Sequence, residues 1–211
     1  EAEKMTQQAQ NAILKTIEEP PTYAIIILLA EQEEALLPTI RSRVLRLSFR
    51  PVPESEILER LLGKGADAKR AKEAARFSRG IYRRAEELAL SEEAYARYRR
   101  TLDLLRALPK CGETVFHRAQ TEITELYPEP RDFLSFLRLY YRDVLCVKSG
   151  GSSAALIFPQ EEEALIREAK DLSYEQAGVI LKETEAAEER FRLNVNKELS
   201  AELLLLAIRR E

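Results

Sequence analysis

The sequence is poor in several residue types on which particular functions depend. Its 211 residues include no tryptophan, one histidine, His117, and two cysteines, Cys111 and Cys146. Without a Cys-x-x-Cys pair, it lacks a disulfide framework and the usual zinc ligands, and one histidine leaves little room for histidine-based catalysis. We interpret both cysteines as small buried hydrophobic residues in a reducing, cytoplasmic protein, and assign His117 no role.

Charge and hydrophobic runs exclude further classes of protein. Lys plus Arg is 33 and Asp plus Glu is 36, giving a net charge of −3, so the chain is not a generally basic nucleic-acid binder, although a local basic face is compatible with this balance. The longest apolar runs, 24–30 and 203–208, are far shorter than the roughly 18 residues of a membrane span. We therefore expect no membrane partner.

The sequence also contains no GxxxxGK[ST] motif. That motif supplies the backbone cradle and the lysine with which many proteins hold nucleotide phosphates. Because ligand clusters of cysteine and histidine are missing as well, we predict that this chain binds neither ATP nor zinc, and we expect no cofactor.

Hydrophobic periodicity predicts a mixed first region. A helix is expected over 5–18 and is ended by Pro20 and Pro21. The continuous apolar run at 23–30 predicts a strand buried on both faces, and the alternation at 44–49 predicts a half-buried strand, with a short helix at 33–41 between them. The expected buried stripe of the first helix is Ala9, Ala12, Ile13, Thr16 and Ile17.

After Pro53 every periodic segment is helical. A small three-helix unit is predicted for 51–90 and a larger helical block for 91–211, so the fold class is mainly α and α+β overall. Asp67, Ser91 and Asn196 can cap helices, Ser173 and Gln176 form a capping box, and Gly80 is a residue that typically follows a helix end. The stretch 149–153 (SGGSS) is the one linker-like segment.

Two stretches are specific enough to indicate a family. They are NAILKTIEEPP at 11–21 and LLPTIRSR at 36–43. Together they resemble the second half of the AAA+ domain of bacterial DNA polymerase III clamp-loader subunits. The form Thr39-Ile-Arg-Ser-Arg43 and the late pattern Asn194-Val-Asn196 followed by Glu202-Leu-Leu-Leu-Leu206 are more similar to delta-prime subunits than to gamma/tau subunits.

This resemblance implies a three-part organisation. Residues 1–50 correspond to the C-terminal part of an AAA+ α/β core, 51–90 to a small helical lid, and 91–211 to a helical collar that mediates oligomerisation. The sequence starts where the family's Walker B strand has just ended, so we expect a C-terminal fragment that lacks the Walker A half. The boundaries near 51 and 91 were reached independently from periodicity.

The resemblance also implies a role in DNA replication. Clamp loaders use ATP to place a sliding clamp on primed DNA, and delta-prime acts in them as a subunit without its own ATPase activity. The implied partners are gamma/tau and delta subunits in a pentameric ring, with the clamp and primed DNA reached through the complex. Ala30 stands where ATPase members carry a polar sensor residue, which agrees with a non-catalytic subunit in a DNA-directed DNA polymerase complex.

Arg43 is the candidate site residue that the resemblance implies. An arginine finger offered in trans stabilises the charge that spreads over a neighbour's γ-phosphate during transfer. Thr39, Ile40, Arg41 and Ser42 complete the motif, and a surface or interface ion pair is the better interpretation of Arg41. Without the motif, a solvated or salt-bridged surface arginine would be the more probable interpretation of Arg43.

Other candidates have simpler interpretations. Lys15, the pair Glu18 and Glu19, and the arginines near Gly80 (Arg76, Arg79, Arg83 and Arg84) are most simply solvated or salt-bridged surface groups. The aromatic residues Phe133, Phe136, Tyr140 and Tyr141 have helical spacing, which favours core or interface over base stacking. The last helix is expected to contact neighbouring subunits through Leu199, Leu203, Leu204 and Leu206.

Two alternatives remain open at this stage. The chain could be a fragment of a gamma/tau-type ATPase, which an intact phosphate loop in the upstream sequence would indicate. Residues 91–211 could also be a generic helical scaffold, which would stay monomeric instead of joining a ring with related subunits.

Overall fold

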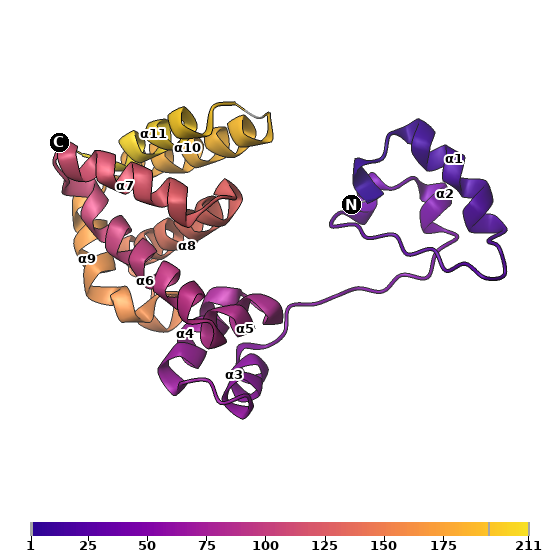
Figure 1. The fold of residues 1–211 in the computed structure, drawn as a ribbon, viewed down its shortest axis with the longest axis horizontal. Coiled ribbons are helices and arrows are strands. Elements are labelled where there is room, and N and C mark those ends of the chain that lie inside the picture. The colour runs from indigo at the N-terminus through magenta and orange to yellow at the C-terminus, as the bar shows by residue number, and fades with distance from the viewer. Residues whose placement is uncertain (1, 194, 211) are drawn as a thin grey trace. The chain divides into compact units, whose positions relative to one another are not determined.

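The computed structural model describes residues 2–193 and 195–210, and the chain divides into a first unit, Glu1–Arg50, and a second unit, Pro51–Glu211 (Figure 1). The described residues are helical or irregular and contain no β-strand. The mainly α fold class expected from the sequence is therefore confirmed. Asn194, part of the late sequence pattern, and the terminal Glu1 and Glu211 lie outside the described residues.

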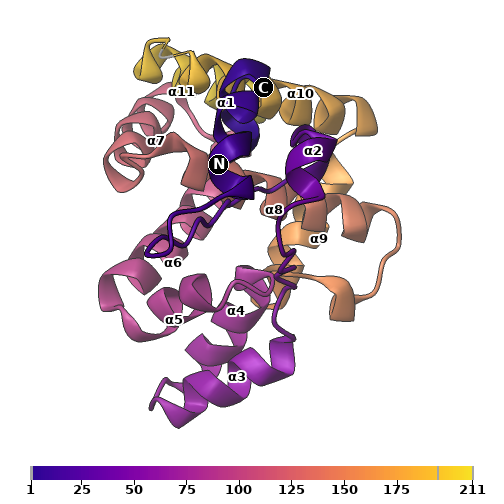
Figure 2. The same ribbon diagram turned by 90° about the vertical axis from the view of Figure 1, so that its right-hand side faces the viewer.

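Among its described residues, 2–50, the first unit contains two α-helices and two short 3-10 turns. The helices are α1, Gln7–Glu18, and α2, Pro38–Arg41, and the turns are Ala2–Lys4 and Glu33–Ala35. Thr6 caps α1, because its hydroxyl accepts the amide of Ala9 at 3.2 Å. Helices α1 and α2 lie side by side (Figures 1 and 2).

The buried face of α1 differs from the expected stripe. Ala12 and Thr16 are exposed, whereas Gln10 is buried and Leu14 is partly buried. The expected stripe counted only apolar and small residues, but the partner segment of α1 presents backbone polar groups, and a glutamine satisfies these.

The two strands expected at 23–30 and 44–49 are not formed in the described residues, and this prediction was wrong. Tyr23 is 90% exposed, Ile25 is 89% exposed and Phe49 is 90% exposed. Both segments are irregular. Between described residues, their one backbone bond outside local turns joins the Leu29 carbonyl to the amide of Ala2, at 2.6 Å. A strand needs a neighbour that pairs with its backbone, which an apolar pattern does not supply.

The second unit is an assembly of nine α-helices within the described residues. They are α3 Glu54–Gly63, α4 Ala68–Ser78, α5 Tyr82–Leu90, α6 Glu92–Ala107, α7 Glu113–Leu126, α8 Pro130–Lys148, α9 Glu162–Asp171, α10 Tyr174–Arg192 and α11 Lys197–Ile208. Short 3-10 turns lie at Leu108–Lys110, Ser153–Ala155 and Pro159–Glu161. Helices α3, α4 and α5 form one group, and α10 pairs with α11 (Figures 1 and 2).

Local signals in the sequence set several of these helix ends. Asp67 caps α4 by accepting the amides of Lys69 and Arg70, each at 3.0 Å. Ser173 and Gln176 form the expected capping box of α10, and Asn196 caps α11. Ser91 caps α6 through the amide of Ala94. These predictions are confirmed.

Gly80 follows the end of α4 at a crowded turn. Its φ is +88°, and a Cβ placed there would lie within 2.8 Å of Pro51 Cα. The carbonyl of Gly80 accepts the amide of Val52 at 3.0 Å. Glycine is therefore needed both for its backbone angle and for the close approach of the 51–52 segment.

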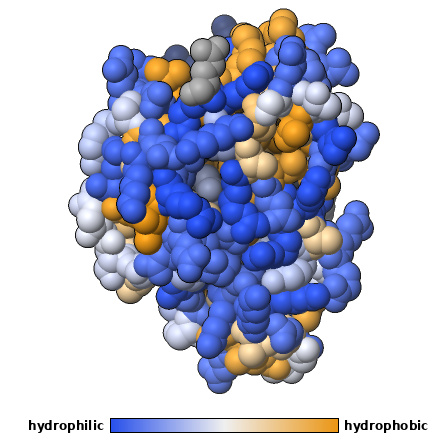
Figure 3. All heavy atoms as spheres, turned by 90° about the vertical axis from the view of Figure 1, so that its left-hand side faces the viewer, coloured by the Kyte–Doolittle hydropathy of each residue, from blue (hydrophilic) through white to orange (hydrophobic). Residues whose placement is uncertain are grey.

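One hydrophobic core runs through the second unit, from Ile57 on α3 to Ile208 at the end of α11. The aromatic residues Phe133, Phe136, Tyr140 and Tyr141 on α8 are buried in it, so their interpretation as core residues is confirmed. Cys111 and Cys146 are free and partly buried against this core. The face shown in Figure 3 is mainly hydrophilic, with apolar side chains in separate patches.

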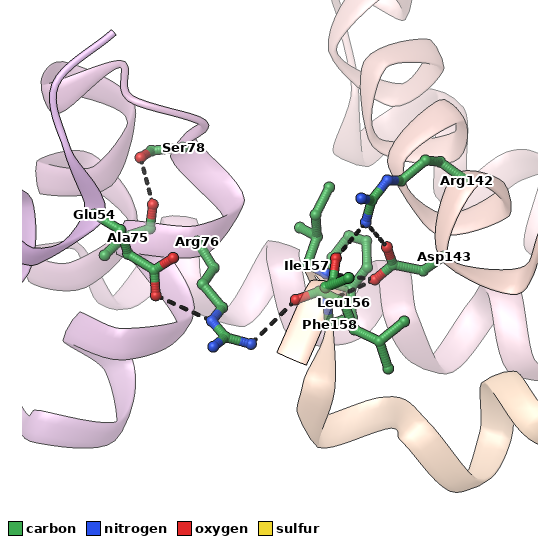
Figure 4. A network of polar contacts seen from close by, with 10 residues as sticks. Glu54, Ala75, Arg76, Ser78, Arg142, Asp143, Leu156, Ile157 and Phe158 are labelled. Carbon is green, nitrogen blue, oxygen red and sulfur yellow. Dashed lines mark hydrogen bonds and ion pairs between the residues drawn. The ribbon is translucent and has the colours of Figure 1, made fainter. Parts of the chain in front are cut away.

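A polar network holds residues 156–158, which follow the linker-like stretch 149–153 (Figure 4). Asp143 is fully buried, and its Oδ2 accepts the amides of Ile157 at 2.7 Å and Phe158 at 2.8 Å. Arg76 on α4 donates to the Leu156 carbonyl at 3.1 Å and to Glu54 Oε1 at 3.0 Å. Residues 156–158 are therefore tied to Asp143 on α8 and, through Arg76, to α4 and Glu54 on α3.

Candidate functional site

The motif residues lie on and directly after α2. Thr39, Ile40 and Arg41 belong to this short helix, and Ser42 and Arg43 form the turn that follows it. Pro38 occupies the first turn of α2, where its fixed φ favours the start of a helix. Ile40 is fully buried, whereas Arg43 is exposed. The motif therefore combines an anchoring apolar residue with an outward guanidinium.

Backbone bonds fix the turn that carries Arg43. The amide of Ser42 donates to the Pro38 carbonyl at 3.0 Å, and the amide of Arg43 donates to the Ile40 carbonyl at 2.9 Å. The Ser42 hydroxyl donates to the Thr39 carbonyl at 3.1 Å. The carbonyls at the end of α2 are thus satisfied locally, which holds the Arg43 backbone in place.

Gln10 ties this segment to α1. Its Nε2 donates to the carbonyls of Met5 and Ala35, each at 3.2 Å, and its Oε1 accepts the amide of Leu37 at 2.8 Å. Sequence reasoning missed this residue. The available signal was its place on α1, three positions before Ile13 and seven before Ile17, where a polar residue on an otherwise apolar face needs buried partners.

The Arg43 guanidinium has partners within the first unit. Its Nη1 donates to the Thr39 carbonyl at 2.9 Å and to Ser42 Oγ at 3.3 Å, and its Nε lies 2.5 Å from Glu18 Oε1. The Arg43 side chain is 40% exposed. A surface ion pair of this kind contributes little to stability, because water competes for both groups. The Glu18 carboxylate was missed as a partner of Arg43 from sequence.

Arg41 has a different environment from Arg43. Its Nη1 lies 4.0 Å from Glu33 Oε1, and the same carboxylate oxygen lies 2.7 Å from Arg46 Nη2. Glu33 thus stands between two arginines on the preceding turn. The two arginines of the motif therefore have different carboxylate partners: Arg41 lies near Glu33, and Arg43 pairs with Glu18.

The four leucines on α11 that were predicted to contact neighbouring subunits differ in their exposure to solvent. Leu199, Leu203 and Leu206 are 50%, 41% and 45% exposed, whereas Leu204 is 1% exposed and belongs to the core. Assigning Leu204 to the outer surface was wrong, because Leu204, Leu205 and Ile208 form the inner face of α11 against the core of the second unit. The outer row is Leu199, Leu203 and Leu206.

The arginines near Gly80 do not form one cluster. Arg76 joins the network around Leu156, whereas the Cζ of Arg84 lies 4.1 Å from the centroid of the Phe77 ring. His117 is exposed on α7. Within residues 2–193 and 195–210, no group of three or more His, Cys, Asp or Glu residues is placed to hold a metal ion. In the same part of the chain, no helix is long and apolar enough to cross a membrane.

Comparison with known proteins adds what the geometry alone does not. The subunit delta' of DNA polymerase III from Bacillus subtilis (strain 168) is 26% identical over 213 aligned residues, covering 98% of this chain and 63% of that protein. The chain is similar to this delta-prime subunit. The resemblance expected from the sequence motifs is therefore confirmed, and the chain spans less than two thirds of the length of that relative.

Two further comparisons each match about a quarter of the chain. The pattern of the family described as "DNA polymerase III, delta subunit" matches residues 1–53. The gamma/tau subunits of Mycobacterium tuberculosis (strain H37Rv) and Mycobacterium bovis are 45% identical over 53 residues, which are 25% of this delta-prime-like chain and 9% of those proteins. The gamma/tau match is thus limited to a quarter of this chain, whereas the delta-prime match covers 98% of it.

Proposed function

We propose that this chain is part of a delta-prime-type, non-catalytic subunit of the bacterial clamp loader in the DNA polymerase III holoenzyme. The observation that carries this proposal is the match to a delta-prime subunit over 98% of the chain. In this role the protein takes part in DNA replication in the cytoplasm. It helps gamma/tau and delta subunits, in a pentameric ring, to load the sliding clamp on primed DNA.

Arg43 is proposed as the arginine finger toward the ATP of a neighbouring subunit. Three features support it: the guanidinium is exposed, its turn is fixed by backbone bonds, and α2 is anchored through Ile40 and Gln10. The ion pair to Glu18 is a surface pair, so a triphosphate with its greater negative charge can displace it. Glu18 then serves to hold the side chain while the neighbour's site is empty.

The test is steady-state ATPase activity and clamp loading by complexes reconstituted with the full-length protein. A trans-acting arginine at a dedicated site is worth on the order of 10³–10⁵ in rate, but only the site facing this subunit is affected. Arg43→Ala should therefore reduce total turnover partially and impair loading. Arg43→Lys should not rescue it, because an ammonium lacks the planar fork.

Arg46→Ala is the matched control. Arg46 is an exposed arginine of the same unit that pairs with Glu33 instead of Glu18. It should leave turnover unchanged, and so should Glu18→Gln, which removes the competing carboxylate. Wild-type turnover and loading in the Arg43→Ala complex would remove Arg43 from the mechanism.

The outer row of α11 is proposed as a subunit contact. Leu199, Leu203 and Leu206 are large apolar side chains left partly exposed on one helix. Leu203→Glu should weaken assembly with related subunits while the isolated chain keeps its stability. Val179→Glu, at an exposed apolar position on α10, is the control; equal loss of assembly in both variants would argue against a contact specific to α11.

The second candidate is a fragment of a gamma/tau-type ATPase. The observation in its favour is the 45% identity to gamma/tau subunits over 53 residues, a quarter of this chain. Calorimetry with ATP on the full-length protein separates the two candidates. Saturable ATP binding and hydrolysis would favour the ATPase, and their absence would favour the delta-prime-type subunit.

A further inference from the structure

A pocket of about 390 Å³ lies inside the second unit, where α4 and α5 meet α6 and α8. Its volume is within the range of small-ligand pockets, roughly 300–1,000 Å³. The walls come from segments far apart in the sequence, including Phe77 and Arg84 on one side and Tyr98, Asp132 and Phe136 on the other. Neither Arg43 nor the outer row of α11 takes part in it.

The floor of this pocket is aromatic. The ring centroid of Phe77 lies 5.2 Å from that of Tyr98 and 5.1 Å from that of Phe136, and the Tyr98 and Phe136 centroids are 5.6 Å apart. All three residues are buried in the core. These rings cover one another and fix the floor, whereas the accessible apolar surface of the lining includes Ile81, which is 58% exposed.

Arg84 projects over this floor without a carboxylate partner. Its Cζ lies 4.1 Å from the Phe77 ring centroid, and in the described part of the chain the side chain forms neither an ion pair within 4.0 Å nor a hydrogen bond. The nearby charge of Asp132 acts on it only from a longer distance, and desolvation lowers the pKa of the guanidinium. A partly buried cation without an anion is unfavourable, so an incoming anion would gain from pairing with it.

The other charged residues of the pocket lining favour a ligand that carries a single negative charge. Arg97 pairs with Glu87 at 3.6 Å, which leaves Arg83 and Arg84 facing Asp132 on the lining. The α5 helix begins beside the pocket at Tyr82, with no side-chain cap and no acidic residue in its first turn, so its positive end adds to the attraction. A dianion would meet repulsion from Asp132, whereas a monoanion is balanced by the net positive charge of the lining.

We propose that this pocket binds a carboxylate placed next to an apolar ring, as a peptide segment of a partner protein presents it. The carboxylate pairs with the planar guanidinium of Arg84, and the ring packs against the exposed Ile81 side chain of the lining. The carboxylate can belong to the C-terminus of the peptide or to an aspartate beside an aromatic residue. This site goes beyond the proposed role of Arg43 and does not depend on it.

The test is an NMR titration of the whole 211-residue chain with small probes. N-acetyl-phenylalanine represents a C-terminal carboxylate, and N-acetyl-aspartyl-phenylalanine amide represents a side-chain carboxylate. N-acetyl-phenylalanine amide is the neutral control, and phenyl phosphate is the dianionic control. At least one carboxylate probe should bind about tenfold or more tightly than the neutral amide, as expected for a charge-assisted bond in a partly desolvated site. The tighter of the two carboxylates identifies the source.

Two substitutions should move this affinity in opposite directions. Arg84→Gln should weaken the carboxylate probe about tenfold or more, whereas Asp132→Asn should strengthen it a few-fold by removing a repulsive charge. The control is Arg118→Gln. Arg118 is exposed on α7 and does not line the pocket, so this substitution makes the same change in net charge as Arg84→Gln and should leave the affinity for the carboxylate probe unchanged.

Three results would overturn the proposal: equal binding of acid and amide, tighter binding of phenyl phosphate, or unchanged binding in the Arg84→Gln chain. If the Arg84→Gln variant does not fold, two measurements still test the proposal. One is the affinity of the wild-type chain for the acid compared with the amide, and the other is the affinity of the Asp132→Asn variant for the acid. An Asp132→Asn chain that binds the acid no better than wild type does counts against the site.

Discussion

The two units of the chain differ in how their structure is maintained. In the described part of the first unit, the buried residues are Ala2, Gln10, Leu36 and Ile40, whereas the second unit has one core that runs through all of its helices. The first unit also leaves two apolar segments, around Ile25 and Phe49, exposed to solvent. Its short α2 helix therefore depends on a few specific contacts, while the helices of the second unit are stabilised collectively.

Because of this difference, the proposed arginine finger depends on the unit that has few buried residues. Arg43 rests on a turn held by backbone bonds, Ile40 and the three hydrogen bonds of Gln10. The second unit can keep its structure when those contacts are lost, because the core cluster includes no residue of 1–50. Loss of the Arg43 geometry and loss of the helical fold should thus be separable events.

The largest expected effect tests whether the units unfold separately. Leu137 and Ile40 are both fully buried, the first on α8 and the second on α2. Leu137→Ala should lower the free energy of unfolding of the main helical transition by about 2–5 kcal/mol, whereas Ile40→Ala should leave that transition in place. Urea unfolding followed by far-UV circular dichroism measures both. An equal shift of the main midpoint in both variants would show that the two units unfold as one.

The next effect separates the two faces of α11 in the second unit. Leu204 is buried and Leu203 is partly exposed. Leu204→Ala should lower the free energy of unfolding by about 2–5 kcal/mol, because it leaves a cavity in the core. Leu203→Ala should change it by no more than about 0.5 kcal/mol. Thermal unfolding of the isolated chain gives both values, and similar losses would mean that Leu203 is also a core residue.

A smaller effect is expected in the first unit. Gln10→Ala removes the acceptor of the Leu37 amide and leaves the Ala35 carbonyl without its donor. The local cost should be about 1–3 kcal/mol for groups that lose their partners away from water. Hydrogen exchange of the Leu37 amide should become faster, while amides of α8 keep their protection. Faster exchange across α8 as well would show that the effect is not local to the first unit, and unchanged exchange at Leu37 would refute the role of Gln10.

The smallest expected effect is a pH dependence in the second unit. The pKa of the Glu73 carboxyl is raised above its ordinary value of 4.5, mainly because burial disfavours the charged form, and its bond from the Tyr95 hydroxyl only partly offsets this. The folded state therefore holds this proton more tightly than the unfolded state does, and Glu73 reduces stability as the pH rises above 4.5.

Glu73→Gln should remove this contribution while it keeps an acceptor for Tyr95. The variant should gain stability relative to wild type at pH 7, by less than the roughly 1 kcal/mol of an ordinary hydrogen bond, and the gain should shrink toward acidic pH. The difference between the urea unfolding midpoints of variant and wild type, measured at pH 7 and at acidic pH, gives this gain in stability. A gain that grows toward acidic pH would reverse the sign assigned to the shift.

The sequence predicted helices better than strands for a physical reason. Caps such as Asp67 and the Ser173–Gln176 box act within one turn, so their signals are local and were read correctly. The strands expected at 23–30 and 44–49 require partners elsewhere, and no local pattern reports whether these are present. Gln10 and Glu18 were missed for a related reason, because Gln10 bonds to Ala35 and Leu37, and Glu18 pairs with Arg43, all 25 or more positions away in the sequence.

The turn after α4 has a consequence for the sequence variation that this fold can accept. Arg79 and Gly80 both have positive φ angles, of 52° and 88°, but their surroundings differ. Position 79 should accept asparagine or glycine at no cost, since only its backbone angle is unusual. At position 80 any side chain would collide with the backbone of Pro51. In a library of single substitutions, two adjacent positions should therefore show opposite tolerance: one permissive to small turn-forming residues, the other restricted to glycine.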